Sequence, residues 1–208
     1  MKLLLFDIDG TLVHAGGSGR VSIESALADV FGRPISTEGV VFSGRTDPGI
    51  MHDILQANGV TPSTANVQQA LSAYKSVVLE QGNPNDVALI PGVLQLVDRL
   101  AARPDVTLGL LTGNIRETAF WKLKAVDLDR HFAFGAFGSD HSDRHQLPPV
   151  AVHRAQQHTG HTFAGSNVVI IGDTKHDIQC GRGIGAFSVA VCTGSYARPD
   201  LHPHNPNV

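Results

Sequence analysis

Several features that would define other protein classes are scarce in this chain of 208 residues. It has only two cysteines, Cys180 and Cys192, too few for a disulfide-rich secreted scaffold, and we expect both to be free thiols in a reducing compartment. No apolar run is long enough to span a bilayer, and none has the pattern of a signal peptide. We therefore expect a cytoplasmic protein without a membrane partner.

An excess of charge of one sign is also lacking. The formal net charge is −3, with 17% charged and 42% hydrophobic residues. Nucleic-acid-binding domains usually show a basic excess, so we expect no nucleic-acid partner. The length and hydrophobic content predict a globular protein with one full core and a small appendage.

The strongest signal is an apolar run that ends in two aspartates. Residues 3–6 predict a buried parallel strand, and Asp7 and Asp9 stand at its carboxyl end. Residues two apart on a strand point to the same side, so these charges would repel each other unless a cation neutralised them. Open α/β sheets bind ligands beyond the carboxyl ends of their strands. The pair therefore predicts a metal-assisted carboxylate site.

Helical patterns dominate the segment from about 15 to 86. We expect a glycine-rich loop over 13–19, whose residues 16–19 would form a hinge. Apolar faces then predict helices near 23–31, 48–57 and 67–78, and Asp47 before a proline predicts the N-cap of the second. We predict that residues 15–86 form an inserted helical cap domain.

Strand and helix patterns alternate in the rest of the chain. The expected strands are 107–111, 132–137, 167–171 and 188–191. This alternation is typical of an α/β fold with a Rossmann-like parallel sheet core and helices on both faces. The predicted core domain comprises residues 1–14 plus 87–208. We expect its polar tail, Pro199 to Val208, to be loose.

Polar residues follow three of the predicted strands, at the same edge of the sheet. They read Asp7-x-Asp9, Thr112-Gly113-Asn114 and Gly172-Asp173-x-x-x-Asp177. Three motifs in this order and context resemble the haloacid dehalogenase (HAD) superfamily hydrolases that carry a helical cap after the first motif. Within that superfamily the chain is similar to phosphoglycolate phosphatases and β-phosphoglucomutases. The resemblance covers nearly the whole chain.

The resemblance implies a phosphatase that uses Mg²⁺ to hydrolyse a small phosphorylated metabolite. Asp7 would be the nucleophile that forms an aspartyl-phosphate, and Asp9 the general acid/base. Mg²⁺ would be held by Asp7, the backbone carbonyl of Asp9, and Asp173.

The second motif would bind the phosphoryl group. Thr112 would offer its hydroxyl group, and the amides of Gly113 and Asn114 would lie nearby as donors. Arg45, in the segment before the second helix, would read an anionic or hydroxylated part of the substrate or stay solvated. Asp177 would buttress the site, orienting the basic group or the metal waters, or would cap the next helix.

The basic residue of this superfamily is missing from its usual place. No lysine lies between Lys124 and Lys175, and Gln146 occupies the slot where a lysine normally stands. Arg144 has the reach and the planar donors to replace that lysine, and we predict that it does. His145 and Lys175 are the alternatives.

Other functions share parts of this pattern. A dehalogenase has no need of Asp9, and a phosphonatase would need a cap lysine where only Lys75 is available. A phosphomutase remains open, because it shares the motifs and differs mainly in the exclusion of water. A phospho-acceptor signalling domain fits the large helical insertion and Asp9 less well, and nothing in the chain suggests a catalytically silent binding module. The sequence leaves monomer and homodimer equally open.

Overall fold

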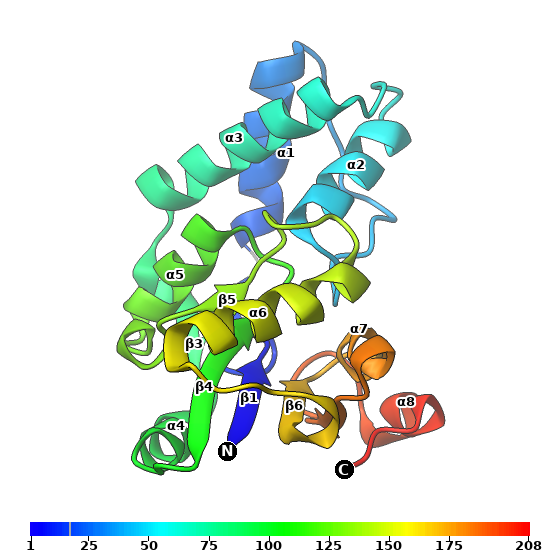
Figure 1. Ribbon diagram of the computed structural model, residues 1–208. Coiled ribbons are helices and arrows are strands. Elements are labelled where there is room, and N and C mark those ends of the chain that lie inside the picture. The colour runs from blue at the N-terminus through cyan, green and yellow to red at the C-terminus, as the bar shows by residue number, and fades with distance from the viewer. Residues whose placement is uncertain (17) are drawn as a thin grey trace.

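The computed structural model describes residues 1–16 and 18–208 and contains a five-stranded sheet (Figure 1). Its strands, in spatial order, are β5 (Gly135–Ala136), β4 (Val106–Leu111), β1 (Lys2–Phe6), β6 (Val168–Gly172) and β7 (Phe187–Ala190). All four pairings are parallel, with β1 at the centre. The predicted α/β, Rossmann-like sheet is therefore confirmed.

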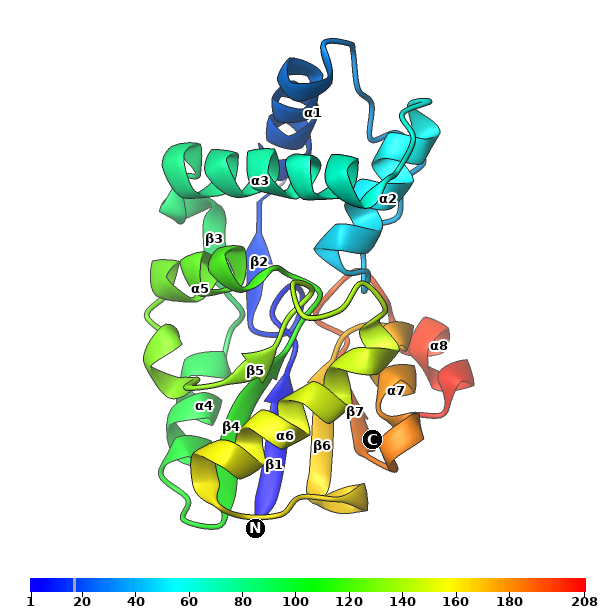
Figure 2. The same ribbon diagram turned by 45° about the horizontal axis from the view of Figure 1, so that its top comes forward.

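Helices cover both faces of this sheet (Figure 2). One face packs on α4 (Val93–Ala101) and α5 (Arg116–Ala125), the other on α6 (Leu147–Thr159) and α7 (Lys175–Cys180). The side chains of β1 alternate between them: Leu3 and Leu5 join the α6 side, whereas Phe6 joins the α4 side. Burial on both faces explains why β1 is a continuous apolar run.

Three further helices stand above the carboxyl ends of the strands (Figures 1 and 2). They are α1 (Ser18–Phe31), α2 (Asp47–Ala57) and α3 (Thr64–Gln81), and we call them the helical unit. Their apolar faces form a separate cluster in which Leu27, Ile54 and Leu55 are fully buried. The predicted boundaries of a cap domain at 15 and 86 stay a prediction, but the helices themselves lie where the apolar periodicity indicated.

Two short strands lie at the ends of the helical unit, where the sequence predicted a loop over 13–19 and no strand over 87–89. β2 (Val13–Ala15) pairs antiparallel with β3 (Val87–Leu89), so residues 13–15 of the expected loop are extended. Strands of three residues with a distant partner leave too short a pattern to recognise. The expected hinge over 16–19 includes Gly17, which lies outside the described residues.

The start of α2 differs from the predicted cap by one residue. Thr46 is the N-cap, because its side chain accepts a hydrogen bond from the Gly49 amide, and Asp47 is the first helical residue. The prediction of Asp47 as N-cap is therefore wrong. Its carboxylate instead accepts a hydrogen bond from the Ile115 amide at 2.8 Å, far away in the sequence.

The carboxyl-terminal tail is ordered, contrary to the expectation that it is loose. It contains the short helix α8 (Arg198–Leu201), and Leu201 is buried (Figure 1). The Ala190 amide donates to the Val208 carbonyl at 2.8 Å, so the tail covers the outer side of β7. Among the described residues, no helix combines the length and the apolar character that a membrane crossing needs.

Candidate active site

Three strand ends bring their polar residues together below the helical unit. Asp7, Thr112 and Asp173 directly follow β1, β4 and β6, and all three are buried. Because neighbouring parallel strands end at one edge, residues more than a hundred positions apart meet there. The convergence that the sequence predicted is present for these residues.

The carboxylates of Asp7, Asp173 and Asp177 form one buried cluster. A ligand oxygen from each lies within 4.8 Å of the others, which is a spacing suited to a metal ion. Burial raises the pKa of Asp7 to about 6, with Arg144 offsetting part of that effect. Burial and the neighbouring Asp7 raise the pKa of Asp173 to about 7. The cluster therefore holds more negative charge than Arg144 neutralises, and its oxygen donors fit a hard divalent cation.

A glycine makes the close approach of Asp173 possible. Gly10 has a φ of +79°, and a Cβ atom there would lie 2.5 Å from Asp173 Oδ2. Any side chain would therefore displace the carboxylate, in addition to straining the backbone. Glycine is therefore needed at position 10, because the carboxylate of Asp173 in the third motif occupies the space that a side chain would fill.

Arg144 lies in the site, where the missing lysine was expected. It begins a 3₁₀ turn (Arg144–Gln146), and its Nη2 is 3.1 Å from Asp7 Oδ1 and 2.5 Å from Asp177 Oδ1. Its side chain is only 6% exposed, and its Nε is buried without a hydrogen-bond partner among the described residues. His145 and Gln146, by contrast, are exposed. The geometry favours Arg144 over both.

Asp177 fits both readings that the sequence left open. Its Oδ2 accepts from the Thr174 amide and hydroxyl group, which forms a capping box at the start of α7. Its Oδ1 accepts from Arg144 at 2.5 Å. Because both oxygens already have partners, Asp177 is better suited to holding Arg144 than to ligating a metal.

Asp9 points away from the acidic cluster and has a partner that the sequence reasoning missed. Lys122 Nζ donates to both Asp9 oxygens, at 2.8 and 2.7 Å, and to Asn114 Oδ1 at 2.7 Å. Burial alone would raise the pKa of Asp9, but the charge and hydrogen bond of Lys122 hold it below its usual range. β1 ends at Phe6, so the strand alternation that predicted Asp7 and Asp9 on one side does not extend to Asp9.

A signal for Lys122 was present in the sequence. The lysine lies four residues after Thr118 and three after Ala119, which are fully buried on the same face of α5, and is itself only 9% exposed. A charged residue on the apolar face of a helix needs a partner, and the nearest candidates are the carboxylates of the first motif. This signal is weak, because a helical lysine usually belongs to the solvated face.

The loop of residues 112–114 is held together by its own hydrogen bonds. Thr112 Oγ1 accepts from the Asn114 amide at 3.3 Å and from Asn114 Nδ2 at 2.8 Å, so its hydroxyl hydrogen can be turned toward a ligand. Asn114 Nδ2 also donates to Asp9 Oδ2 at 2.7 Å. Asn114 thus positions its neighbours, and its predicted role as a direct phosphoryl donor, like that of Gly113, stays a prediction.

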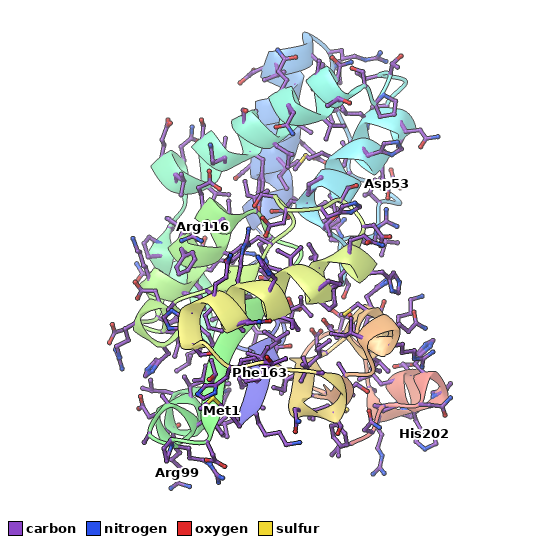
Figure 3. All side chains as sticks on the ribbon, in the orientation of Figure 1. Met1, Asp53, Arg99, Arg116, Phe163 and His202 are labelled. Atoms are coloured by element: carbon purple, nitrogen blue, oxygen red, sulfur yellow. The ribbon has the colours of Figure 1, made fainter. Side chains whose placement is uncertain are left out.

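A cavity of about 710 Å³ joins this site to the helical unit. Its walls include Asp7, Asp173 and Arg144 of the site, together with Arg20, Phe42 and Tyr74 of the helical unit and its loops. Arg45 also lines it, with Nη2 paired to Asp53 Oδ2 at 2.7 Å, and Figure 3 shows Asp53 on α2. Arg45 thus lies at the cavity wall and is held there by Asp53. The contact between Arg45 and a substrate stays a prediction.

Comparison with known proteins points to one family. A phosphoglycolate phosphatase from Pseudomonas savastanoi pv. phaseolicola is 26% identical over 202 residues, which are 95% of this chain and 72% of the relative. A predicted phosphoglycolate phosphatase from Haemophilus somnus has the same fold, with a TM-score of 0.71 and 21% identity over 100% of this chain and 92% of the other. A protein assigned as a β-phosphoglucomutase from Thermotoga maritima matches with a TM-score of 0.62 and 17% identity, covering 99% and 92%.

The family profile of the haloacid dehalogenase-like hydrolases matches residues 4–191, which contain all three motifs. The fold, the order of the motifs and the convergence of their side chains agree with that match. The resemblance expected from the sequence is thus confirmed, and the chain belongs to the haloacid dehalogenase-like hydrolases.

Proposed function

We propose that this hydrolase is a Mg²⁺-dependent phosphatase that cleaves a small phosphomonoester through an aspartyl-phosphate on Asp7. The observation that carries the proposal is the buried Asp7 carboxylate, which lies 3.1 Å from Arg144 and within one cluster with Asp173. A nucleophile beside a fixed cation and a pair of carboxylates for a metal is what phosphoryl transfer requires.

In the first half of the reaction Asp7 attacks the phosphorus atom and the ester oxygen leaves. The buried Arg144 Nε, which has no partner among the described residues, and the Thr112 hydroxyl group would bind the phosphoryl oxygens. Because Lys122 keeps Asp9 ionised, the proton for the leaving oxygen would come from the substrate monoanion and be relayed by Asp9, whose carboxylate Lys122 stabilises after the transfer.

In the second half water attacks the phosphorus atom of the aspartyl-phosphate. Asp9, now ionised and held by Lys122 and Asn114, would accept the proton of that water. The bond between phosphorus and Asp7 breaks, phosphate is released, and the Asp7 carboxylate is regenerated beside Arg144.

Asp7 and Asp173 would hold Mg²⁺, together with the backbone carbonyl of Asp9. Asp177 would support them by holding Arg144, since its two oxygens are already bonded. Bound Mg²⁺ would supply positive charge to the phosphoryl oxygens and to the crowded carboxylates.

Turnover of p-nitrophenyl phosphate should require Mg²⁺ and stop in EDTA, returning when excess Mg²⁺ is added. Undiminished hydrolysis in the chelator would contradict the proposed metal role.

The effect of Mg²⁺ on the protein should also vary with pH. The pKa values of Asp7 and Asp173, about 6 and about 7, are raised above their ordinary value, so both tend to protonate in the metal-free fold.

The sign of this pH dependence follows from proton linkage. In the metal-free protein these two carboxyls bind protons more tightly when folded, so their contribution to stability is lost as pH rises through 4 to 7. Mg²⁺ binding needs both ionised, so the rise in melting temperature caused by Mg²⁺ should be large at pH 8 and vanish by about pH 5. A Mg²⁺ effect that is equal at both pH values would contradict the assignment of these ligands.

Replacing Lys122 by methionine should lower kcat by roughly tenfold or more, because Asp9 loses its cation and its fixed orientation. The loss of that cation also raises the pKa of Asp9, so the limb of the pH–rate profile that reports Asp9 should move to higher pH. The exposed Lys124 on the same helix gives the matched control, Lys124→Met. Identical profiles for the two variants would remove Lys122 from the mechanism.

The substrate class follows from the relatives and the cavity. Phosphoglycolate is the first metabolite to test, because that is what the curated relatives are named for. A phosphomutase is the second candidate, favoured by the fold shared with the Thermotoga maritima protein. Release of inorganic phosphate from a sugar phosphate would support the phosphatase, and formation of an isomeric sugar phosphate would support the mutase.

For either activity, residues 15–86 would act as the cap domain and residues 1–14 plus 87–208 as the core domain.

A further inference from the structure

The segment before α2 makes a close contact with the loop of residues 112–114, which we call the phosphoryl-binding loop, and with Ile115, which follows it. A Cβ atom on Gly113 would lie 2.0 Å from the carbonyl oxygen of Arg45, so only glycine permits this approach. Beside it, Thr46 Oγ1 donates to the Ser142 carbonyl at 2.5 Å. The helical unit and the core are therefore in direct backbone contact next to the second motif.

Asp47 holds this loop from two sides. Its own amide donates to the Gly113 carbonyl at 2.7 Å, and its Oδ2 accepts from the Ile115 amide at 2.8 Å. Asp47 is 8% exposed, so water competes little for either bond.

The two bonds fix both peptide planes that flank Asn114. The Gly113 carbonyl shares a rigid plane with the Asn114 amide, and the Ile115 amide shares one with the Asn114 carbonyl. Asn114 in turn donates to Asp9 Oδ2 and to Thr112 Oγ1 through its side chain. A shift of the Asn114 backbone would therefore disturb the hydrogen bonds that orient Asp9 and Thr112.

We infer that Asp47 is a positioning residue for phosphoryl transfer: from the helical unit, it fixes Asn114 and, through it, the orientations of Asp9 and Thr112. This inference rests on the proposed function and adds to it that the helical unit completes the phosphoryl-binding loop, besides lining the cavity. Asp47 itself contacts the loop backbone and does not touch the reacting atoms.

The test compares Asp47→Ala with Asp47→Asn, since the asparagine side-chain oxygen can still accept from Ile115. Asp29→Ala, at an exposed position on α1, is the control. We expect Asp47→Ala to lower kcat with p-nitrophenyl phosphate and Mg²⁺ by about 10²-fold, the cost of a small misplacement at a reacting centre. The KM of Asp47→Ala should change by less than about threefold, because the interactions lost in this variant act mainly in the transition state. Asp47→Asn should keep most of the rate, because its side-chain oxygen can still accept from the Ile115 amide.

Orthovanadate separates positioning from folding. It resembles the trigonal transition state, so its inhibition constant should rise in Asp47→Ala roughly in parallel with the loss of kcat/KM. If Asp47 served only stability, the variant would melt earlier while the vanadate constant and the rate per folded molecule stayed unchanged, and the inference would be overturned. It would also be overturned if Asp47→Asn were as damaging as Asp47→Ala.

Should Asp47→Ala not fold, Asp47→Ser is measured instead, because its shorter side chain cannot reach the Ile115 amide in the same way, and the same expectations hold. An unaltered protein that neither turns over the ester nor binds vanadate would contradict the proposed function itself. An active unaltered protein with insensitive variants would contradict only the role of Asp47.

Discussion

Asp7→Asn should reduce phosphatase turnover by roughly 10⁴-fold or more, since it removes the nucleophile and leaves nothing in its place. Asparagine has nearly the same shape as aspartate, but its amide cannot displace the leaving oxygen. The fold should survive, because Arg144 keeps its 2.5 Å contact with Asp177. The measurement is the single-turnover rate with p-nitrophenyl phosphate and Mg²⁺, together with the melting temperature.

Asp9→Asn is the matched variant for that experiment. As an acid/base residue, Asp9 should contribute roughly 10²–10⁴-fold, and its replacement should slow both formation and hydrolysis of the intermediate. Asp7→Asn should therefore be the more severe of the two. A variant at Asp7 that kept a near-normal rate would mean that the nucleophile lies elsewhere in the chain.

Arg144→Ala should be the most damaging change outside the aspartates, in both activity and stability. The guanidinium is the only cation in contact with Asp7 among the described residues, so the phosphoryl oxygens would lose a fixed donor. Asp7 and Asp177 would be left buried without their partner, and breaking a buried charge pair in this way typically costs about 3–5 kcal/mol. We expect kcat to fall by roughly 10²–10³-fold, as for the loss of one oxyanion donor.

Gln146→Ala serves as the control, since Gln146 occupies the slot of the usual lysine but is exposed. Its activity and melting temperature should match those of the unaltered protein. Arg144→Lys should restore part of the stability by returning a charge, but little of the rate, because an ammonium cannot contact Asp7 and Asp177 while also directing an Nε donor. Equal rates for Arg144→Ala and Gln146→Ala would exclude Arg144 from the site.

The sequence was sufficient to predict the parts of this structure that depend on local patterns. Apolar runs identified β1, β4 and β6. Because polar residues directly follow these runs in the sequence, their place at the carboxyl ends of the strands could be predicted as well. Arg144 could be found because a charge expected in this superfamily was missing, and only a few residues could supply it. Its contacts with Asp7 and Asp177 agree with that reasoning.

What the sequence did not reveal depends on partners far away along the chain. β2 and β3 pair across the whole helical unit, and the tail is ordered by hydrogen bonds to β7. Asp47 looked like a helix cap, and its actual partner, the Ile115 amide, lies 68 positions away. Lys122 is the exception, since its position on the apolar face of α5 could have indicated a buried charge pair.

The most direct test of the proposed mechanism is to locate the phosphoryl group during turnover. The unaltered protein and Asp9→Asn are mixed with Mg²⁺ and substrate, quenched in acid within the first turnover, digested and analysed by mass spectrometry. We predict one phosphoryl group on Asp7, removable by hydroxylamine as expected for an acyl phosphate, and a slower loss of that group in Asp9→Asn, where hydrolysis of the intermediate is impaired. A phosphoryl group on another residue, or none while the ester is being hydrolysed, would contradict the aspartyl-phosphate mechanism.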